Sequence, residues 1–360
     1  MSEDFNIEDF KQVFSSKDFA LPVRWDGVDF ALTLKNVYER YNNILLNISF
    51  NNKSIRGVAP HIRQICDTIL SALREYLNGK PSEAFRIFNQ LFVEKLMVNQ
   101  FSIYDKTFDP SILESKNKAN SSRLFRVRKV SDNKTYERKD VFHTPFNLRN
   151  KVATTRYSIA GYPSLYLSSS LELCLEELDY EINPGRYICS RFEMSQNKSP
   201  RIIELGIKPT DFFQNYNYAP TKRQRLFRDV LFHNVDNDIL KNYYIWFPLI
   251  IACSFIRINR SDPFGVEYII PQLLMQSVRS FNSSNSFLGV RFFSCSSEYS
   301  SELGFNYVFP TNFINKEEKF CSVLSDAFLL TEPVFLNEYE DVEYCEEALL
   351  RAQTEKIRIS

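Results

Sequence analysis

The sequence predicts an α+β protein in which helices come first and a mixed region of helices and strands follows. Over roughly the first 120 residues, apolar residues recur at spacings of three and four, which is the periodicity of amphipathic helices. After about residue 124 the pattern changes to short alternating runs between loops, which is typical of strands. The polar segment 116–122 (KNKANSS) separates the two patterns and is predicted to be a linker.

The N-terminal region, residues 1–120, is predicted to contain three main helices. The first covers residues 30–48. The second carries Pro60 in its first turn, where proline is tolerated, and ends at Asn78-Gly79. Ser82 is expected to cap the third. An all-helical N-terminal domain follows from these patterns.

The second region is predicted to combine strands with buried helices. Strands are expected at 124–130, 164–168, 187–192 and 288–293, with helices in an insertion at about 221–258 and at 269–280. The apolar segment Tyr243–Phe255 has about 13 residues and a proline, short of the roughly 20 that a membrane-spanning helix needs. It is therefore predicted to be a buried helix. The acidic stretch 338–347 is expected to be a solvated face.

Composition argues against several classes of protein. Forty-four basic and forty-four acidic residues give zero formal net charge, so the charge excess typical of nucleic-acid binding is missing. The seven cysteines are scattered and the three histidines lie far apart, which disfavours a zinc site or a disulfide framework. The N-terminal MSEDFNIEDF lacks the pattern of a secretory signal. These observations favour a cytoplasmic protein that contacts neither nucleic acid nor membrane.

The segment RLFRVR carries the first candidate site residues. In a strand, Phe125 and Val127 would face one side, and Arg126 and Arg128 the other. Two guanidinium groups on one surface could clamp phosphate oxygens, because arginine offers planar, bidentate donors. The alternative is an exposed basic strand face.

A candidate carboxylate lies in SSSLELCLEEL, the predicted helix after Leu167. On a helical plot Glu172 and Glu176 share a polar arc, whereas Glu177 falls among apolar residues. A carboxylate that is costly to bury is often part of a functional site. The alternative is a structural ion pair with a nearby arginine.

Four further residues are candidates for the site. Arg156 and Tyr166 lie in a loop and in the strand after it, where substrate contacts are common, although Tyr166 taken by itself fits a core residue better than a ligand contact. His143 in FHTPF could act as a base or be a satisfied loop residue. Ser294 follows an apolar strand without a nucleophile elbow around it, so a serine hydrolase is disfavoured.

Taken in order, LFRVR, RYSIAGYPSLYL, the helix with Glu177, EYIIPQLL and FLGVRFFSCSS resemble the RES-domain family over about residues 121–310. The resemblance implies an ADP-ribosyltransferase-like domain with a mixed β core at 121–315, followed by a C-terminal extension, 316–360, that packs on it. It also implies a bacterial toxin that destroys NAD by phosphorolysis or hydrolysis at the nicotinamide ribose. The family's tryptophan and asparagine beside the second arginine are absent here.

The resemblance implies roles for individual residues. Glu177, Arg126 and Ser294 correspond to its catalytic residues, and Arg156 and Tyr166 to substrate contacts; Arg128 and His143 are added as substrate-binding candidates from the residues alone. No bound cofactor is implied, since NAD is the substrate and inorganic phosphate a co-substrate in the phosphorolytic case. An NAD-degrading enzyme needs an antitoxin or regulatory partner, and the N-terminal helices are candidates for self-association or sensing. The alternatives are a protein ADP-ribosyltransferase and a catalytically silent interaction module in which Arg126 and Glu177 simply pair.

Overall fold

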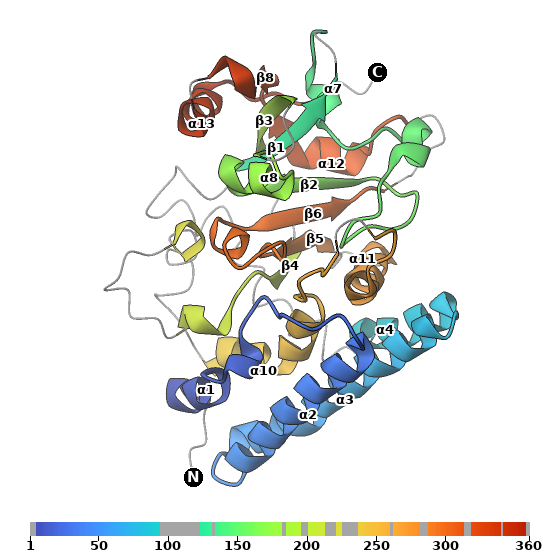
Figure 1. Ribbon diagram of the computed structural model, residues 1–360, viewed down its shortest axis with the longest axis vertical. Coiled ribbons are helices and arrows are strands. Elements are labelled where there is room, and N and C mark those ends of the chain that lie inside the picture. The colour runs from blue at the N-terminus through green and yellow to red at the C-terminus, as the bar shows by residue number, and fades with distance from the viewer. Residues whose placement is uncertain are drawn as a thin grey trace.

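The structure is a computed structural model of the 360-residue chain (Figure 1). It describes residues 5–93, 123–131, 134–181, 185–195, 201–212, 221–224, 237–259, 262–280, 287–312, 318–339 and 341–357. The fold is α+β, as predicted, with an N-terminal helical region and a mixed sheet. Within the described ranges, no helix has the length and apolar character that crossing a membrane requires.

The described N-terminal region is helical, and its elements are α1 (Ile7–Phe14), η1 (Lys17–Phe19), α2 (Phe30–Ser49), α3 (Lys53–Leu77) and α4 (Pro81–Val93). The first predicted helix is confirmed as α2. The second begins earlier than predicted, because the Asn52 side chain caps it by accepting a hydrogen bond from the Ile55 amide. Pro60 therefore lies inside α3 rather than in its first turn. The predicted stop is confirmed, with Gly79 at a φ of +78° just past the end.

One mixed sheet forms the centre of the rest of the described chain. Its strands are β1 (Arg123–Val130), β2 (Ser164–Ser168), β3 (Arg186–Met194), β4 (Arg201–Leu205), β5 (Phe287–Phe292), β6 (Asn306–Pro310), β7 (Phe328–Leu330) and β8 (Val334–Phe335). The order is β4-β5-β6-β2-β1-β3-β7, with β8 also beside β3. The β4–β5 pair is parallel and the other described pairs are antiparallel. All four predicted strands are present to within two residues at each end.

The two central strands β1 and β2 separate along their length. Their register contains the single pair Phe125 and Ser168, whereas β1 and β3 pair continuously from Arg123 to Val130. The residues that would pair next in this register, Val127 and Tyr166, are not paired. This separation opens the middle of the sheet on the side of Arg126.

The helices outside the N-terminal region are α7 (Arg138–Val141), η3 (Phe146–Lys151), α8 (Leu171–Glu177), η4 (Pro209–Phe212), α10 (Asn237–Ala252), η5 (Val266–Tyr268), α11 (Ile269–Ser280), η6 (Ser300–Glu302), α12 (Ser322–Ala327), η7 (Leu336–Glu338) and α13 (Val342–Arg351). The predicted helix at 269–280 is confirmed as α11, and the apolar segment from Tyr243 forms the buried part of α10.

Two cores hold these elements together. The large core joins the N-terminal helices to α10, α11 and the sheet, as Phe14, Phe247 and Val290 illustrate. In Figure 1, α10 and α11 lie between the sheet and the pair α3 and α4, which they contact. A smaller core packs α8 and α13 on β1 and β3. The predicted domain boundaries near residues 120 and 315, and the predicted linker, lie outside the described residues.

The C-terminal residues complete the sheet. β7 and β8 both pair antiparallel with β3. The acidic stretch that was predicted to be a solvated face overlaps α13, whose glutamates lie beside the buried Cys345 and Leu349. The prediction is therefore correct for one side of this helix, while its other side belongs to the smaller core.

Candidate functional site

A cavity of about 460 Å³ opens where β1 and β2 separate. Its lining includes four of the predicted site residues, Arg126, Arg156, Tyr166 and Glu177. They come from β1, the loop before β2, β2 itself and the end of α8. The structure thus brings together residues that are up to about 50 positions apart in the sequence.

Arg126 is the least satisfied charge in this cavity. Its Nη1 atom is buried and has no hydrogen-bond partner among the residues that the structure describes. Burial is the main cause that lowers the pKa of its guanidinium to about 9, and the charge of Arg128 lowers it further. The group is still cationic at neutral pH. A buried cation without a partner is costly, and an anion with oxygen acceptors in the cavity would relieve that cost.

Glu177 is the last residue of α8, and a Schellman motif ends the helix directly after it. The Tyr180 amide donates to Leu175 O and the Asp179 amide to Glu176 O, both at 3.1 Å. Asp179 occupies the left-handed position with a φ of 50°, where glycine is the usual residue. A non-glycine residue in the left-handed backbone region is strained, and such strain is often found at functional sites.

The predicted burial of Glu177 is wrong, because its side chain is exposed. The helical plot assumed that the helix continues, whereas α8 stops at this residue, so the carboxylate projects from a helix end over the cavity. Two hydrogen bonds hold it there. Ser296 Oγ donates to Oε2 at 2.9 Å and Asn306 Nδ2 donates to Oε1 at 2.7 Å.

Asn306 and Ser296 are site residues that the sequence reasoning missed. Asn306 is buried at the start of β6, and its Oδ1 accepts a hydrogen bond from Ser168 Oγ at 2.6 Å. This second bond fixes the amide orientation, so that Nδ2 points at Glu177. Ser296 lies in the predicted segment GVRFFSCSS, but composition does not distinguish it from the serines beside it. The register of β2 and β6, which pairs Ser168 with Asn306, could not be read from the sequence.

Arg156 is partly engaged by the protein itself. Its Nη1 and Nη2 donate to the carbonyls of Cys253 and Phe255 at 3.3 and 2.8 Å. Its guanidinium carbon lies 4.9 Å from the centre of the Tyr268 ring, and that of Arg257 lies 4.8 Å from the same ring. Arg257 and Tyr268 also line the cavity, and neither was predicted.

Tyr166 presents a half-buried ring to the cavity. Its hydroxyl lies 2.6 Å from Thr155 Oγ1 in a hydrogen bond, and burial raises its pKa. The phenol therefore stays neutral, and its ring forms a flat wall beside the arginines. In total the lining combines three arginines, Arg126, Arg156 and Arg257, with the carboxylates of Glu177 and Asp179.

Arg126 and Glu177 do not form an ion pair in the described part of the chain. Each lines the cavity, yet the Arg126 Nη1 atom is without a partner and the carboxylate is held by Ser296 and Asn306. The interaction module in which the two side chains satisfy each other is therefore disfavoured.

Ser294, a predicted catalytic residue, does not line the cavity. It is fully buried, and its Oγ lies 2.9 Å from Ser300 Oγ and accepts the Ser296 amide at 3.2 Å. Ser294 shapes the turn that presents Ser296 to Glu177. The physical reason is that β5 ends at Phe292, so the chain turns before the serines and a different hydroxyl points at the carboxylate.

Arg128 and His143, predicted to bind substrate, also lie outside the cavity lining. Arg128 Nη1 donates to the carbonyl of Asp140. His143 is fully buried, with Nε2 accepting the Cys321 amide at 2.8 Å and Nδ1 2.8 Å from the Thr144 carbonyl. Burial is the main cause that lowers its pKa to about 4, so it is neutral with the proton on Nδ1. Both side chains support the loop between β1 and β2.

Comparison with known proteins gives one informative match. The chain is 28% identical over 324 residues to a Bacillus subtilis (strain 168) protein named "Putative toxin YopC", which covers 86% of this chain and 67% of that protein. No protein-family model matches the chain, and no solved structure does.

Proposed function

We propose that the protein is an enzyme that degrades NAD by cleaving the nicotinamide–ribose bond, with phosphate or water as the acceptor, and that it acts as a toxin or defence effector. The observation that carries the proposal is the buried Nη1 atom of Arg126, which has no partner among the described residues, in the same cavity as the hydrogen-bonded carboxylate of Glu177. The name of the Bacillus subtilis relative supports the toxin role, and the resemblance to RES domains motivates the NAD-degrading activity.

The arginines of the cavity suit the pyrophosphate of NAD. NAD carries an anionic pyrophosphate, and arginine is well suited to bind it through paired N–H donors. Arg126 supplies an unused donor, and Arg156 keeps N–H groups beyond the two that reach backbone carbonyls. A cavity of about 460 Å³ lies within the usual size range of ligand sites.

The carboxylate suits the reacting sugar. Cleavage of the glycosidic bond builds positive, oxocarbenium-like charge on the ribose, and a fixed negative charge stabilises it. Ser296 and Asn306 hold Glu177 in place before substrate arrives, so little reorganisation is needed. Its remaining lone pairs are available to a ribose hydroxyl, while Tyr166 or Tyr268 offers a ring face to the nicotinamide.

The direct test is mass spectrometry of NAD incubated with the purified protein, with and without inorganic phosphate. Free ADP-ribose indicates hydrolysis, and its phosphorylated form indicates phosphorolysis. Glu177→Gln should lower the rate by about 10²- to 10³-fold, the usual cost of losing one such transition-state contact. Glu176→Gln is the matched control, because this neighbour does not line the cavity. Equal NAD consumption by Glu177→Gln and wild type would contradict the proposal.

A second candidate is a protein ADP-ribosyltransferase, which cleaves the same bond. The exposure of Glu177 at the cavity mouth favours it, since a bulky acceptor could approach the sugar from that side. Incubation with labelled NAD separates the two functions, because transfer leaves label on protein whereas degradation leaves it in small molecules. Either enzyme would harm its own cell, by depleting NAD or by modifying cellular proteins. We therefore include an antitoxin or other regulatory partner in the proposal.

A further inference from the structure

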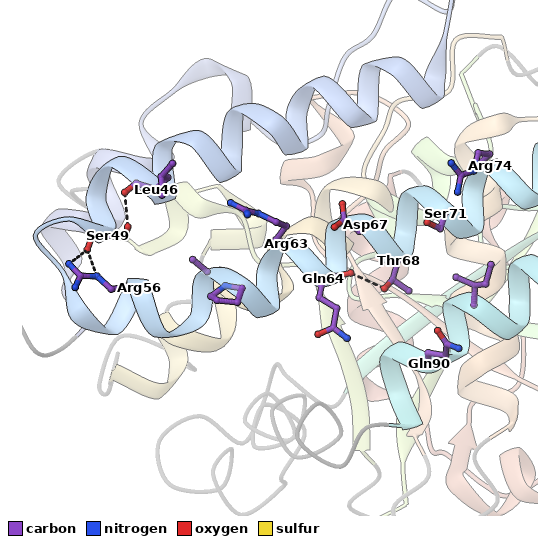
Figure 2. Close-up of a pocket in the computed structure, with 13 residues that line it drawn as sticks. Leu46, Ser49, Arg56, Arg63, Gln64, Asp67, Thr68, Ser71, Arg74 and Gln90 are labelled. Carbon is purple, nitrogen blue, oxygen red and sulfur yellow. Dashed lines mark hydrogen bonds between the residues drawn. The ribbon is translucent and has the colours of Figure 1, made fainter.

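A second and larger hollow, of about 780 Å³, lies on the N-terminal helices, away from the cavity described above (Figure 2). We call it the helix groove. Its lining comes from the second half of α2, the outer side of α3 and the middle of α4. Figure 2 shows the lining side chains following α3 from Arg56 to Arg74.

Charged residues of the helix groove form a straight stripe on α3. Arg56, Arg63, Asp67 and Arg74 are spaced by seven, four and seven residues. At 100° per residue these steps keep successive side chains within about 40° of one another. The stripe spans about 27 Å along the helix at 1.5 Å per residue. Three arginines and one aspartate make this surface positive in a chain whose formal net charge is zero.

Two of the three arginines have no ion-pair partner in the described part of the chain. Within the described residues, the side chains of Arg63 and Arg74 are exposed and form no ion pair, while Arg56 donates to the backbone carbonyls of Ser49 and Phe50. The arginines of the neighbouring helices differ, since Arg40 pairs with Asp18 and Arg86 with Glu83. Among the arginines of α2, α3 and α4, those without an ion pair in the described residues therefore lie in the helix groove.

Apolar side chains lie beside the charged stripe. Leu46 of α2 is 48% exposed, and Ala59, Pro60 and the half-buried Ile87 of α4 also contribute to the lining. Ala59 is small, and Gly57 nearby has nothing within 4 Å of the position of a Cβ atom, so the first third of α3 carries two small residues beside open space. Helices pack closely where side chains are small and apolar, at axial distances of about 8–10 Å.

We propose that the helix groove binds an amphipathic, acidic helix of a partner protein. Such a helix would lay its apolar side chains on Leu46, Ala59 and Ile87 and would place two carboxylates, about three turns apart like Arg63 and Arg74, opposite these two arginines. The length of the stripe corresponds to roughly 18 residues of a partner helix. This surface does not include the NAD site, and the inference does not depend on the proposed function.

The test uses the full chain and a labelled synthetic helical peptide that has leucines along one stripe and, beside it, glutamates with the same eleven-residue separation as Arg63 and Arg74. Fluorescence anisotropy should show micromolar binding that weakens with salt. The double variant Arg63→Glu/Arg74→Glu should bind at least about tenfold more weakly. A peptide with lysines in place of the glutamates should prefer the double variant, which identifies charge pairing as the cause.

The matched control is Arg40→Glu/Arg86→Glu, which changes two arginines of α2 and α4 that lie outside the helix groove. It should bind the acidic peptide like wild type, and circular dichroism should show that both double variants are folded. The inference is overturned if a glutamine peptide binds as well as the glutamate peptide, or if the Arg63 and Arg74 changes have no effect. Binding to anionic phospholipid vesicles or duplex DNA, without binding to the peptide, would also overturn it.

Discussion

Two arginines of this protein, Arg223 and Arg126, have opposite environments. Arg223 is fully buried and forms a bidentate ion pair with Asp211 at 2.6 and 2.7 Å, with Glu302 at 3.4 Å from Nη2. Lys208 joins the same cluster through Glu302. Arg126 lines a cavity, and its Nη1 has no partner. Arg223 is therefore a structural residue, because a carboxylate of the protein neutralises it. Arg126 indicates a binding site, because its anion would have to come from a ligand.

The largest expected effect comes from removing Asp211, the carboxylate that pairs with Arg223. Asp211→Ala should destabilise the fold by about 3–5 kcal/mol, because it leaves the Arg223 cation buried without its main partner. Urea unfolding followed by circular dichroism measures the loss. Glu39→Gln, which removes an exposed partner of Lys35, is the control and should leave the unfolding midpoint unchanged. An Asp211→Ala midpoint equal to wild type would remove the structural half of the comparison.

The next effect concerns His143, which lies close enough to Arg126 for the guanidinium charge to contribute to its low pKa. The pKa falls from 6.5 to about 4, chiefly through burial, so the unfolded chain binds more protons between these pH values. The contribution of neutral His143 to the free energy of unfolding should be fully present above pH 6.5. The free energy of unfolding should fall by about 3 kcal/mol as the pH drops toward 4.

The measurement for His143 is the unfolding free energy as a function of pH. His143→Gln removes the titrating group and should flatten the part of the slope that lies between pH 4 and 6.5, whatever its effect at neutral pH. An unchanged slope in this variant would mean that other groups cause the acid sensitivity.

Arg126→Met tests whether Arg126 binds an anionic ligand, unlike the structural Arg223. Removing a buried charge that has no partner should leave stability within about 1 kcal/mol of wild type or raise it. Inorganic phosphate or NAD should raise the thermal midpoint of wild type, since a ligand stabilises the state that binds it, and should not raise that of the variant. Arg128→Met is the control, because Arg128 does not line the cavity. Equal ligand-induced shifts in both variants would contradict the assignment of Arg126.

The smallest expected effect separates Ser296 from Ser294. Ser296→Ala removes one of two hydrogen bonds to Glu177 and should lower NAD consumption by about 5- to 10-fold, which corresponds to about 1 kcal/mol. Ser294→Ala should act on stability, because its hydroxyl is buried against Ser300. The reverse outcome, with Ser294 controlling the rate of a stably folded variant, would restore the assignment made from the sequence.

Much of the site could be predicted because local patterns carried it. Alternation in RLFRVR placed Arg126 and Arg128 on one face, and the resemblance to RES domains singled out Arg126, Arg156 and Tyr166, which all line one cavity, whereas Arg128 does not. Glu177 was identified for an incorrect reason, since its position on a helical wheel mattered less than the Schellman motif that ends α8 beneath it. Short-range patterns do not report where a short helix stops when an aspartate takes the left-handed position of glycine.

The sequence alone determined the α+β class, the helices α2 and α11 and the main strands, because periodicity and capping are local properties of the chain. Tertiary structure decided which polar groups found partners. The separation of β1 from β2 left Arg126 without one, the pairing of β2 with β6 brought Asn306 to Glu177, and the packing of the loop after β1 buried His143. Those outcomes depend on contacts between residues far apart in the sequence, which no local pattern encodes.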